Sequence, residues 1–362
     1  MIEFVEKNRA DLEAFTQMSG TAGARCDYVQ GGGGNTSVKL ADGLMAIKAS
    51  GYCLSDITPE SGYAVLDYEA LRKFYYGNEP AQLEDVEKQG STCAKENTKT
   101  IDGLASVRPS VEAGFHSILD KFVCHTHAVY ANLATCATNC REIAAAAFAG
   151  ADYSWGWVPY TDPGANLTFA IRDELARVEK ETGKRPAVIL MQNHGIIAHA
   201  DDAGACLKIH ADANARLAAQ YGLSGDSFPP VSVREVEPGL FAADTPYLKT
   251  ALASGKYDYK TLIEKPLYPD QMVFLIGTLF ENKTQLEENE ASVDFSTGAL
   301  LLRMGQKKAQ VITETLTAVL FIMDAIAAHG GTVSTMGEAA KHFIANWESE
   351  KYRKSLAGKG KA

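Results

Sequence analysis

Three of the eight histidines in this chain stand where they could share one metal ion. His125 and His127 lie in Phe122-Val-Cys-His-Thr-His, an apolar run typical of a buried strand. Because residues i and i+2 of a strand point to the same face, both imidazoles can reach one ion. His194 follows a second apolar run, residues 186–191, at a strand end where ligands of α/β sheets gather. Three such ligands beside an open position are typical of a catalytic metal site.

A carboxylate is expected next to these histidines. Glu112 lies near the start of a predicted helix, residues 110–120, which directly precedes the strand of His125. A carboxylate beside a divalent ion is what proton transfer next to a carbonyl requires. Alternatively, Glu112 is an ordinary acidic residue at a helix start. For the histidine pair, the alternative is hydrogen bonding to backbone carbonyls. We expect His116 to support the site or the packing, with metal binding as its alternative.

The second unusual stretch is Gly31-Gly-Gly-Gly-Asn35-Thr-Ser. Consecutive glycines permit positive φ and let backbone N–H groups converge on an anion. Ala49-Ser50-Gly51 supplies a second small turn rich in donors. A plain turn before a strand is the alternative for the glycine run. Neither stretch matches a Walker loop or a dinucleotide fingerprint, so nucleotide binding is not indicated.

The segments that must position these residues alternate between strands and helices. We expect strands at residues 36–40, 44–48, 122–127 and 186–191, and helices at 3–22, 110–120, 167–182 and 203–221. This alternation predicts a layered α/β fold. Gly, Ser and Pro accumulate near residues 222–232, which predicts a catalytic domain over 1–225 and a C-terminal unit over 226–362. In that unit we expect helices at 244–254, 306–329 and 335–354, and strands at 271–276 and 298–303.

Composition excludes several classes of partner. The net charge is −10 and no long basic run precedes the tail, so we expect no nucleic-acid partner. The seven scattered cysteines lack CxxC spacing, which indicates reduced thiols and a cytoplasmic protein. No uninterrupted apolar run reaches about 18 residues, so we expect no membrane span. Charges in Met1-Ile-Glu-Phe-Val-Glu-Lys also argue against a signal peptide.

Together these motifs resemble the class II aldolase/adducin family, which includes fuculose- and rhamnulose-phosphate aldolases. The matching elements, in the family's order over roughly residues 10–222, are Gly34-Asn35-Thr-Ser-Val, Ala49-Ser-Gly51, Pro109-Ser-Val-Glu112, His125-Thr-His127 and Asn193-His194-Gly195. The resemblance implies a three-layer αβα domain with a central β-sheet, followed here by a smaller α/β C-terminal domain. It also implies a homotetramer with sites at subunit interfaces.

The resemblance assigns roles to residues of this chain. It implies a divalent metal, Zn²⁺ foremost, on His125, His127 and His194, and Glu112 as the catalytic acid/base. The residues that it implies for binding the substrate's phosphate are Gly34, Asn35, Ser50, Gly51 and Ser110.

The activity implied is that of a lyase. It would cleave a ketose 1-phosphate or a related sugar acid in a reversible aldol reaction through a metal-stabilised enediolate. Decarboxylase, dehydratase and 4-epimerase activities of the same family are alternatives, and Glu rather than Asp at position 112 favours an aldolase or decarboxylase over the epimerase. A non-catalytic adducin-like binding module is the alternative from another class; the complete set of histidines and carboxylate argues against it.

The chain departs from the aldolase pattern in three places. Its loop is all glycine before Asn35, and Val111 replaces a second serine, which weakens the expectation of phosphate binding. The tyrosine after the histidine strand is missing from residues 144–148, which leaves Tyr160 and Tyr153 as candidate proton donors. The third is the added C-terminal unit, for which we favour packing, oligomerisation or a lid. Alternatively, its stretches 265–271 and 346–348 could reach a neighbouring active site.

Overall fold

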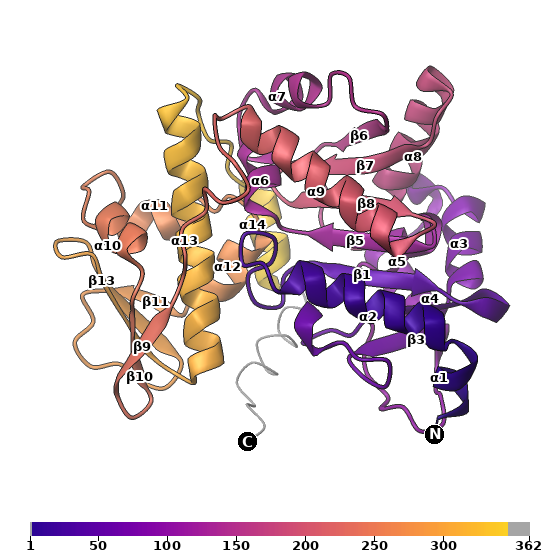
Figure 1. Ribbon diagram of the computed structural model, residues 1–362, viewed down its shortest axis with the longest axis horizontal. Helices are drawn as coiled ribbons and strands as arrows, with labels where there is room; N and C mark the ends of the chain where they lie inside the picture. The colour runs from indigo at the N-terminus through magenta and orange to yellow at the C-terminus, as the bar shows by residue number, and fades with distance from the viewer. Residues whose placement is uncertain (1, 347–362) are drawn as a thin grey trace.

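The computed structural model describes residues 2–346. Two predictions extend past residue 346, the helix over 335–354 and the stretch 346–348. Their parts from residue 347 onward lie outside the described residues. Figure 1 shows two sheets of unequal size, with the long helix α13 (Gln306–Ala328) between them. The larger sheet belongs to the N-terminal part of the chain and carries the histidines.

The larger sheet has eight strands in the order β4-β3-β2-β1-β5-β8-β7-β6. Neighbouring strands are antiparallel throughout, except for the parallel pair β6 and β7. The strands are β1 (Asn35–Lys39), β2 (Leu44–Lys48), β3 (Tyr63–Asp67), β4 (Thr98–Lys99), β5 (Phe122–Thr126), β6 (Ser154–Val158), β7 (Pro186–Met191) and β8 (Gly195–Ala200).

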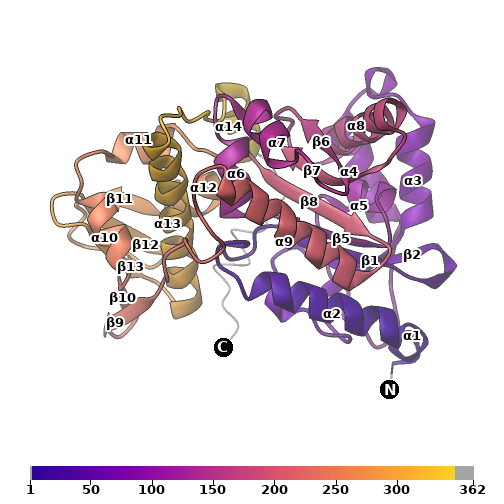
Figure 2. The same cartoon turned by 45° about the horizontal axis from the view of Figure 1, so that its top comes forward.

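Helices cover both faces of this sheet, which confirms the predicted three-layer α/β fold (Figures 1 and 2). Alternate residues of the strands pack into opposite cores: Cys124 and Ala198 face one core, and Val123 and Ile197 face the other. The first face is covered by α2 (Arg9–Gly23), α7 (Cys140–Ala147) and α9 (Ala203–Ala219). The second face is covered by α3 (Tyr68–Gly77), α5 (Ala113–Ile118) and α8 (Ala165–Thr182).

Among the described residues, this part contains three further helices and three 3₁₀ turns. They are α1 (Glu3–Lys7), α4 (Val86–Glu96), α6 (Val129–Thr135) and the 3₁₀ turns η1 (Ala41–Gly43), η2 (Leu54–Asp56) and η3 (Pro80–Gln82). The helix expected over 3–22 is thus interrupted at Asn8, and the helix expected from Ser110 begins only at Ala113. The end predicted for the helix of residues 167–182 is confirmed, since Gly183 adopts φ 70°, a conformation that glycine takes without strain.

The C-terminal part contains a five-stranded sheet in the order β11-β12-β13-β10-β9. Its strands are β9 (Val233–Glu237), β10 (Leu240–Ala243), β11 (Leu279–Glu281), β12 (Glu290–Asp294) and β13 (Ala299–Arg303). Its helices are α10 (Pro246–Leu252), α11 (Tyr259–Glu264), α12 (Pro269–Leu275), α13 and α14 (Glu338–Asn346). The strand predicted at 271–276 is therefore wrong: Pro269 begins a helix there, because proline fits the first helical turn, where its missing N–H is not needed.

One apolar core joins the two parts of the chain. It combines Tyr130 and Leu133 of α6 with Leu316 and Leu320 of α13. Among the described helices, α13 alone has the length and apolar composition to cross a membrane, but here 61% of its most apolar window is buried within the fold. The composition of α13 therefore suits its place between the two sheets.

Candidate functional site

The three histidines predicted to share a metal converge in the structure. His125 is the penultimate residue of β5, His127 follows that strand, and His194 sits in the turn between β7 and β8. All three are buried, and one ring nitrogen of each lies within 4.8 Å of the others. Their ring centroids are 5.0–5.1 Å apart. Histidines at this spacing form a compact set of nitrogen donors.

Hydrogen bonds at the far sides of two rings fix which nitrogen faces the centre. His125 donates from Nδ1 to the carbonyl oxygen of Ile196 at 2.9 Å, and His127 donates from Nδ1 to Asp270 Oδ2 at 2.5 Å. The Nε2 atoms of both rings are buried without a hydrogen-bond partner among the described residues. Burial lowers the pKa of His125 to about 3, so its ring is neutral at pH 7. Neutral imidazoles with a free nitrogen are the form that binds a divalent ion, so these residues fit one.

Glu112 lies beside the histidines, as predicted. Its Oε1 is 3.3 Å from His194 Nε2 and its Oε2 is 3.5 Å from His125 Nε2. Burial raises the pKa of Glu112, but the imidazoles of His125 and His194 outweigh it and hold that pKa well below its usual value. The carboxylate is therefore ionised at neutral pH and can accept a proton.

A chain of hydrogen bonds orients this carboxylate. Asn35 donates from Nδ2 to Glu112 Oε2 at 2.6 Å, and its carbonyl oxygen accepts from His116 Nε2. His116 Nδ1 in turn accepts from the Ser37 hydroxyl at 2.7 Å. Burial holds the pKa of His116 well below its usual value, so this ring is neutral. His116 thus supports the site through Asn35, and both of its nitrogens are engaged away from the three-histidine cluster.

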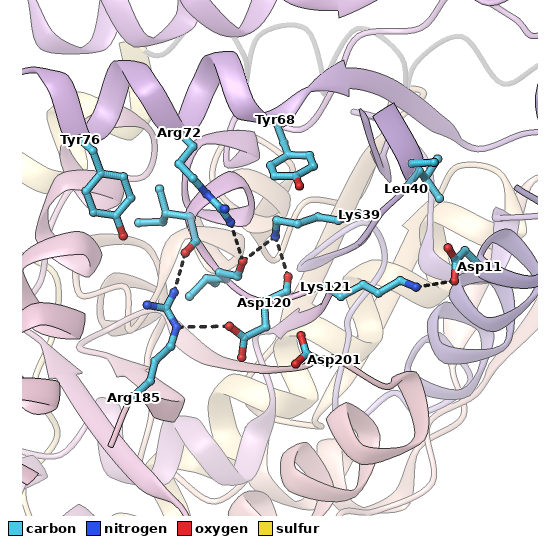
Figure 3. A pocket seen from close by; sticks show the side chains of 13 residues that line it. Asp11, Lys39, Leu40, Tyr68, Arg72, Tyr76, Asp120, Lys121, Arg185 and Asp201 are labelled. Atoms are coloured by element: carbon cyan, nitrogen blue, oxygen red, sulfur yellow. Dashed lines mark hydrogen bonds and ion pairs between the residues drawn. The ribbon is translucent and has the colours of Figure 1, made fainter. Parts of the chain in front are cut away.

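The helix that carries Glu112 is anchored at its other end. The carbonyl groups at the end of α5 converge on the Lys39 ammonium, which binds the oxygens of His116, Leu119 and Asp120 at 2.6–2.8 Å. Arg72 bonds the carbonyl oxygens of Ser117 and Leu119, and Arg185 bonds that of Ile118. Figure 3 shows Lys39, Arg72 and Arg185 directed at the same group of carbonyls. These cations line a cavity of about 660 Å³. Because these cations already bond carbonyl groups at the end of α5, we interpret the residues that line this larger cavity as structural support for α5.

A smaller cavity of about 50 Å³ lies at the histidines. Glu112, His127 and His194 line it, together with all five residues expected to bind phosphate: Gly34, Asn35, Ser50, Gly51 and Ser110. The structure thus brings the predicted site residues together, with His125 behind them. Neither Tyr153 nor Tyr160 lines this cavity, and their hydroxyls bond Asp212 and Asp162 instead.

Sequence reasoning missed Lys48 and Pro269, which also line the small cavity. Lys48 is buried, and its ammonium donates to the carbonyl of Tyr52 at 2.7 Å. A charged residue that closes the apolar run of residues 44–47, one position before a donor-rich turn, is the signal that could have found it. Pro269 belongs to the stretch 265–271 of the C-terminal part, which we considered for a neighbouring active site but to which we assigned no binding residue.

Close packing explains two of the consecutive glycines. Gly34 has φ +65°, and a Cβ there would lie 2.5 Å from the carbonyl oxygen of His125. Gly31 has φ +60°, and a Cβ there would lie 2.5 Å from Val311 of α13. Side chains at either position would collide with the strand of the site or with the long helix. The run is therefore required for packing, whether or not it also binds an anion.

Comparisons with known proteins identify a family for the chain. The chain is similar to the N-terminal class II aldolase domain of a conserved protein from Thermoplasma acidophilum, with 22% identity over 57% of this chain and 92% of that chain and a TM-score of 0.47. It is also similar to an aldolase II superfamily protein from Pseudomonas syringae, with 16% identity over 61% of this chain and 80% of that chain and a TM-score of 0.39. A third similar structure is L-fuculose-1-phosphate aldolase from Thermus thermophilus, with 16% identity over 57% of this chain and 92% of that chain and a TM-score of 0.33. Among curated proteins, no sequence matches the chain. The sequence model of the class II aldolase and adducin N-terminal domain matches residues 20–221, more than half of the chain. The chain therefore belongs to the class II aldolase and adducin N-terminal domain family.

Proposed function

We propose that this chain is a metal-dependent lyase that cleaves the bond between the carbons α and β to a carbonyl in a small anionic sugar derivative, a ketose 1-phosphate or a sugar acid. The observation that carries the proposal is the convergence of His125, His127 and His194 with the buried, ionised Glu112 facing two of them. A non-catalytic binding module has no need of a complete donor set around a buried carboxylate.

Each group has a defined task in this proposal. His125, His127 and His194 would hold the cation, which when bound supplies Lewis-acid polarisation of the substrate carbonyl. Glu112 would remove the proton from the carbon next to that carbonyl in the condensation direction and return it in the cleavage direction. Asn35 holds the Glu112 carboxylate in place, and burial keeps bulk water away from it. The geometry of these residues suits proton transfer at carbon.

An anionic substrate is supported by the other wall of the cavity. Ser50, Gly51, Ser110 and the buried Lys48 line it, and the two serine hydroxyls can donate hydrogen bonds, whereas the backbone N–H groups of Ser50 and Ser110 already bond carbonyl oxygens. A positive charge of low exposure strengthens the binding of an anion because little water screens it. We include in the proposal Zn²⁺ as the first metal to test and a homotetramer as the assembly.

The test begins with elemental analysis of the purified protein and of His194→Ala. About one divalent ion per chain in the wild type, lost in the variant, is expected, and His329→Ala at the exposed end of α13 serves as the matched control. A screen of ketose 1-phosphates for aldehyde release then follows, in which Glu112→Gln should keep the metal and lose about 10²–10⁴-fold in kcat.

The outcomes separate the family's reactions. Release of CO₂, loss of water or formation of an epimer, without aldehyde, would replace aldol cleavage with that reaction. A fully active Glu112→Gln variant would contradict the role of the carboxylate. If no metal binds under any loading condition, the binding-module alternative takes over. Sedimentation velocity tests the assembly, and a monomer at micromolar concentration would contradict the tetramer.

A further inference from the structure

A segment of the C-terminal part, residues 267–271, lies against the histidine site of the same chain. Pro269 lines the small cavity, and the Tyr268 ring lies 6.3 Å from that of His127. The Tyr268 hydroxyl also donates to Gln30 Oε1 at 3.4 Å, across 238 positions of sequence. This segment is part of the stretch 265–271 that we considered for a neighbouring active site, and the structure places it at the chain's own.

Within this segment, Asp270 contacts one of the histidines directly. Asp270 lies in the first turn of α12, is completely buried, and accepts the hydrogen bond from His127 Nδ1 at 2.5 Å. Glycine at residue 33 leaves room for this pair: a Cβ there would collide with the Asp270 carboxylate and lie 3.1 Å from His127 Nδ1. Three separate regions of sequence are therefore shaped to fit this one contact.

The same segment also holds the turn that carries His194. Asn193 adopts φ 51°, a left-handed conformation that costs energy in most residues. Its side-chain amide donates to the carbonyl oxygens of Leu267 and Ser334, each at 2.8 Å. Both acceptors belong to the C-terminal part. Two of the three histidines are therefore positioned by contacts from outside residues 20–221, the region that the family shares.

We propose that Asp270 is a positioning residue of the metal site and that the C-terminal part is a structural component of that site. The carboxylate fixes the Nδ1–H tautomer and the ring orientation of His127, so that Nε2 points to the other two histidines. It also makes the imidazole a stronger donor, since a carboxylate partner raises the basicity of a metal-binding ring. This inference rests on the proposed metal-binding function.

Replacement of Asp270 tests the inference through metal affinity rather than turnover. We expect Asp270→Asn and Asp270→Ala to bind Zn²⁺ about 10–100-fold more weakly, with the larger loss for alanine, in competition with a chromophoric chelator. The visible absorption bands of the Co²⁺-loaded protein should change as well, because the ring of His127 is no longer held. The control is Asp324→Asn, since Asp324 lies in the same part but bonds Tyr247 and Tyr257, each at 2.8 Å.

The outcomes keep the two proposals apart. If the wild type binds no metal, the proposed function fails and this inference fails with it. If the wild type binds Zn²⁺ and both Asp270 variants bind it equally well, only the inference is overturned. An equal loss in Asp324→Asn would overturn it too, since general loosening of the C-terminal part would then explain the effect. Should Asp270→Ala fail to fold, the Asp270→Asn variant, with folding checked by circular dichroism, decides alone.

Discussion

The side-chain amide of Asn35 donates to Glu112 Oε2 at 2.6 Å and to Ser110 Oγ at 3.1 Å. Because His116 Nε2 bonds the amide oxygen of Asn35, the amide cannot turn around, and its NH₂ group faces the carboxylate. The sequence motif containing Asn35 was expected to bind phosphate. In the structure this residue lines the cavity and also holds the catalytic carboxylate that we propose.

Replacing Asn35 by Asp should therefore reduce turnover while the metal is retained. A hydrogen bond to a charged group contributes about 1.5–3 kcal/mol, and its loss corresponds to about a 10–100-fold lower kcat. The second carboxylate should also raise the pKa of Glu112 by repulsion, which would move the acid limb of the pH–rate profile upward. Steady-state kinetics and elemental analysis check this, with Asn78→Asp at the end of α3 as the control. Loss of metal instead of turnover would contradict it.

Lys39 should matter more for stability than Lys121, although both line the larger cavity (Figure 3). The buried Lys39 ammonium binds three carbonyl oxygens at the end of α5, so Lys39→Met should lower the free energy of unfolding by about 1.5–3 kcal/mol. Lys121 bonds Asp11 at 2.7 Å in a partly exposed pair, and Lys121→Met should cost under about 1 kcal/mol. Urea unfolding of both variants measures the difference; equal losses would show that α5 is not anchored this way.

The apolar runs in the sequence predicted the strands that carry the site, but they did not predict the less regular strands. β5 and β7 are nearly continuous apolar runs, whereas β6 is interrupted by Gly156 and β8 follows its turn directly at Gly195. The run Met272-Val-Phe-Leu in α12 was assigned to a strand because a short apolar run fits a buried strand or helix equally well. Pro269 was the available signal for a helix start.

The residues of the candidate site also divide into those that the sequence predicts and those that it does not. His125, His127, His194 and Glu112 were predictable because each stands in a short motif at a strand or helix end. Asp270 lies in the stretch 265–271 considered for a neighbouring active site, but its pairing with His127 of the same chain was not predictable, because the two residues meet across 143 positions of sequence. Local patterns report local structure, and a contact made by folding one part of a chain against another leaves no such pattern.

Gly33 offers a test of that contact from the opposite side. Gly33→Ala should weaken Zn²⁺ binding about tenfold or more, because the added Cβ would displace the Asp270 carboxylate or the His127 ring. Gly20→Ala in α2 is the control, because a Cβ added at this position would have no atom within 4 Å. Alanine there should stabilise the helix by about 0.5–1 kcal/mol. Unchanged metal affinity in a folded Gly33→Ala protein would show that the pair tolerates displacement.

Buried neutral histidines should make the protein sensitive to acid, and His210 provides the cleanest test. His210 of α9 is fully buried beside Thr126, with 2.7 Å between Nε2 and the hydroxyl oxygen. Burial, together with the charge of Arg25, lowers the pKa of His210 to about 3. Between about pH 3 and pH 6.5 the unfolded chain therefore binds a proton that the folded chain does not. The free energy of unfolding must fall as the pH falls through this window.

We expect His210 to contribute a slope of about 1.4 kcal/mol per pH unit within that window, so His210→Gln should flatten the loss between about pH 6.5 and pH 5 by about 2 kcal/mol. Urea unfolding of the metal-free protein at several pH values measures this. His116 and His125 titrate in both proteins, so the difference between the two curves isolates His210. Parallel curves for wild type and His210→Gln would mean that this ring is protonated in the folded state. Another interaction would then have to stabilise its buried positive charge.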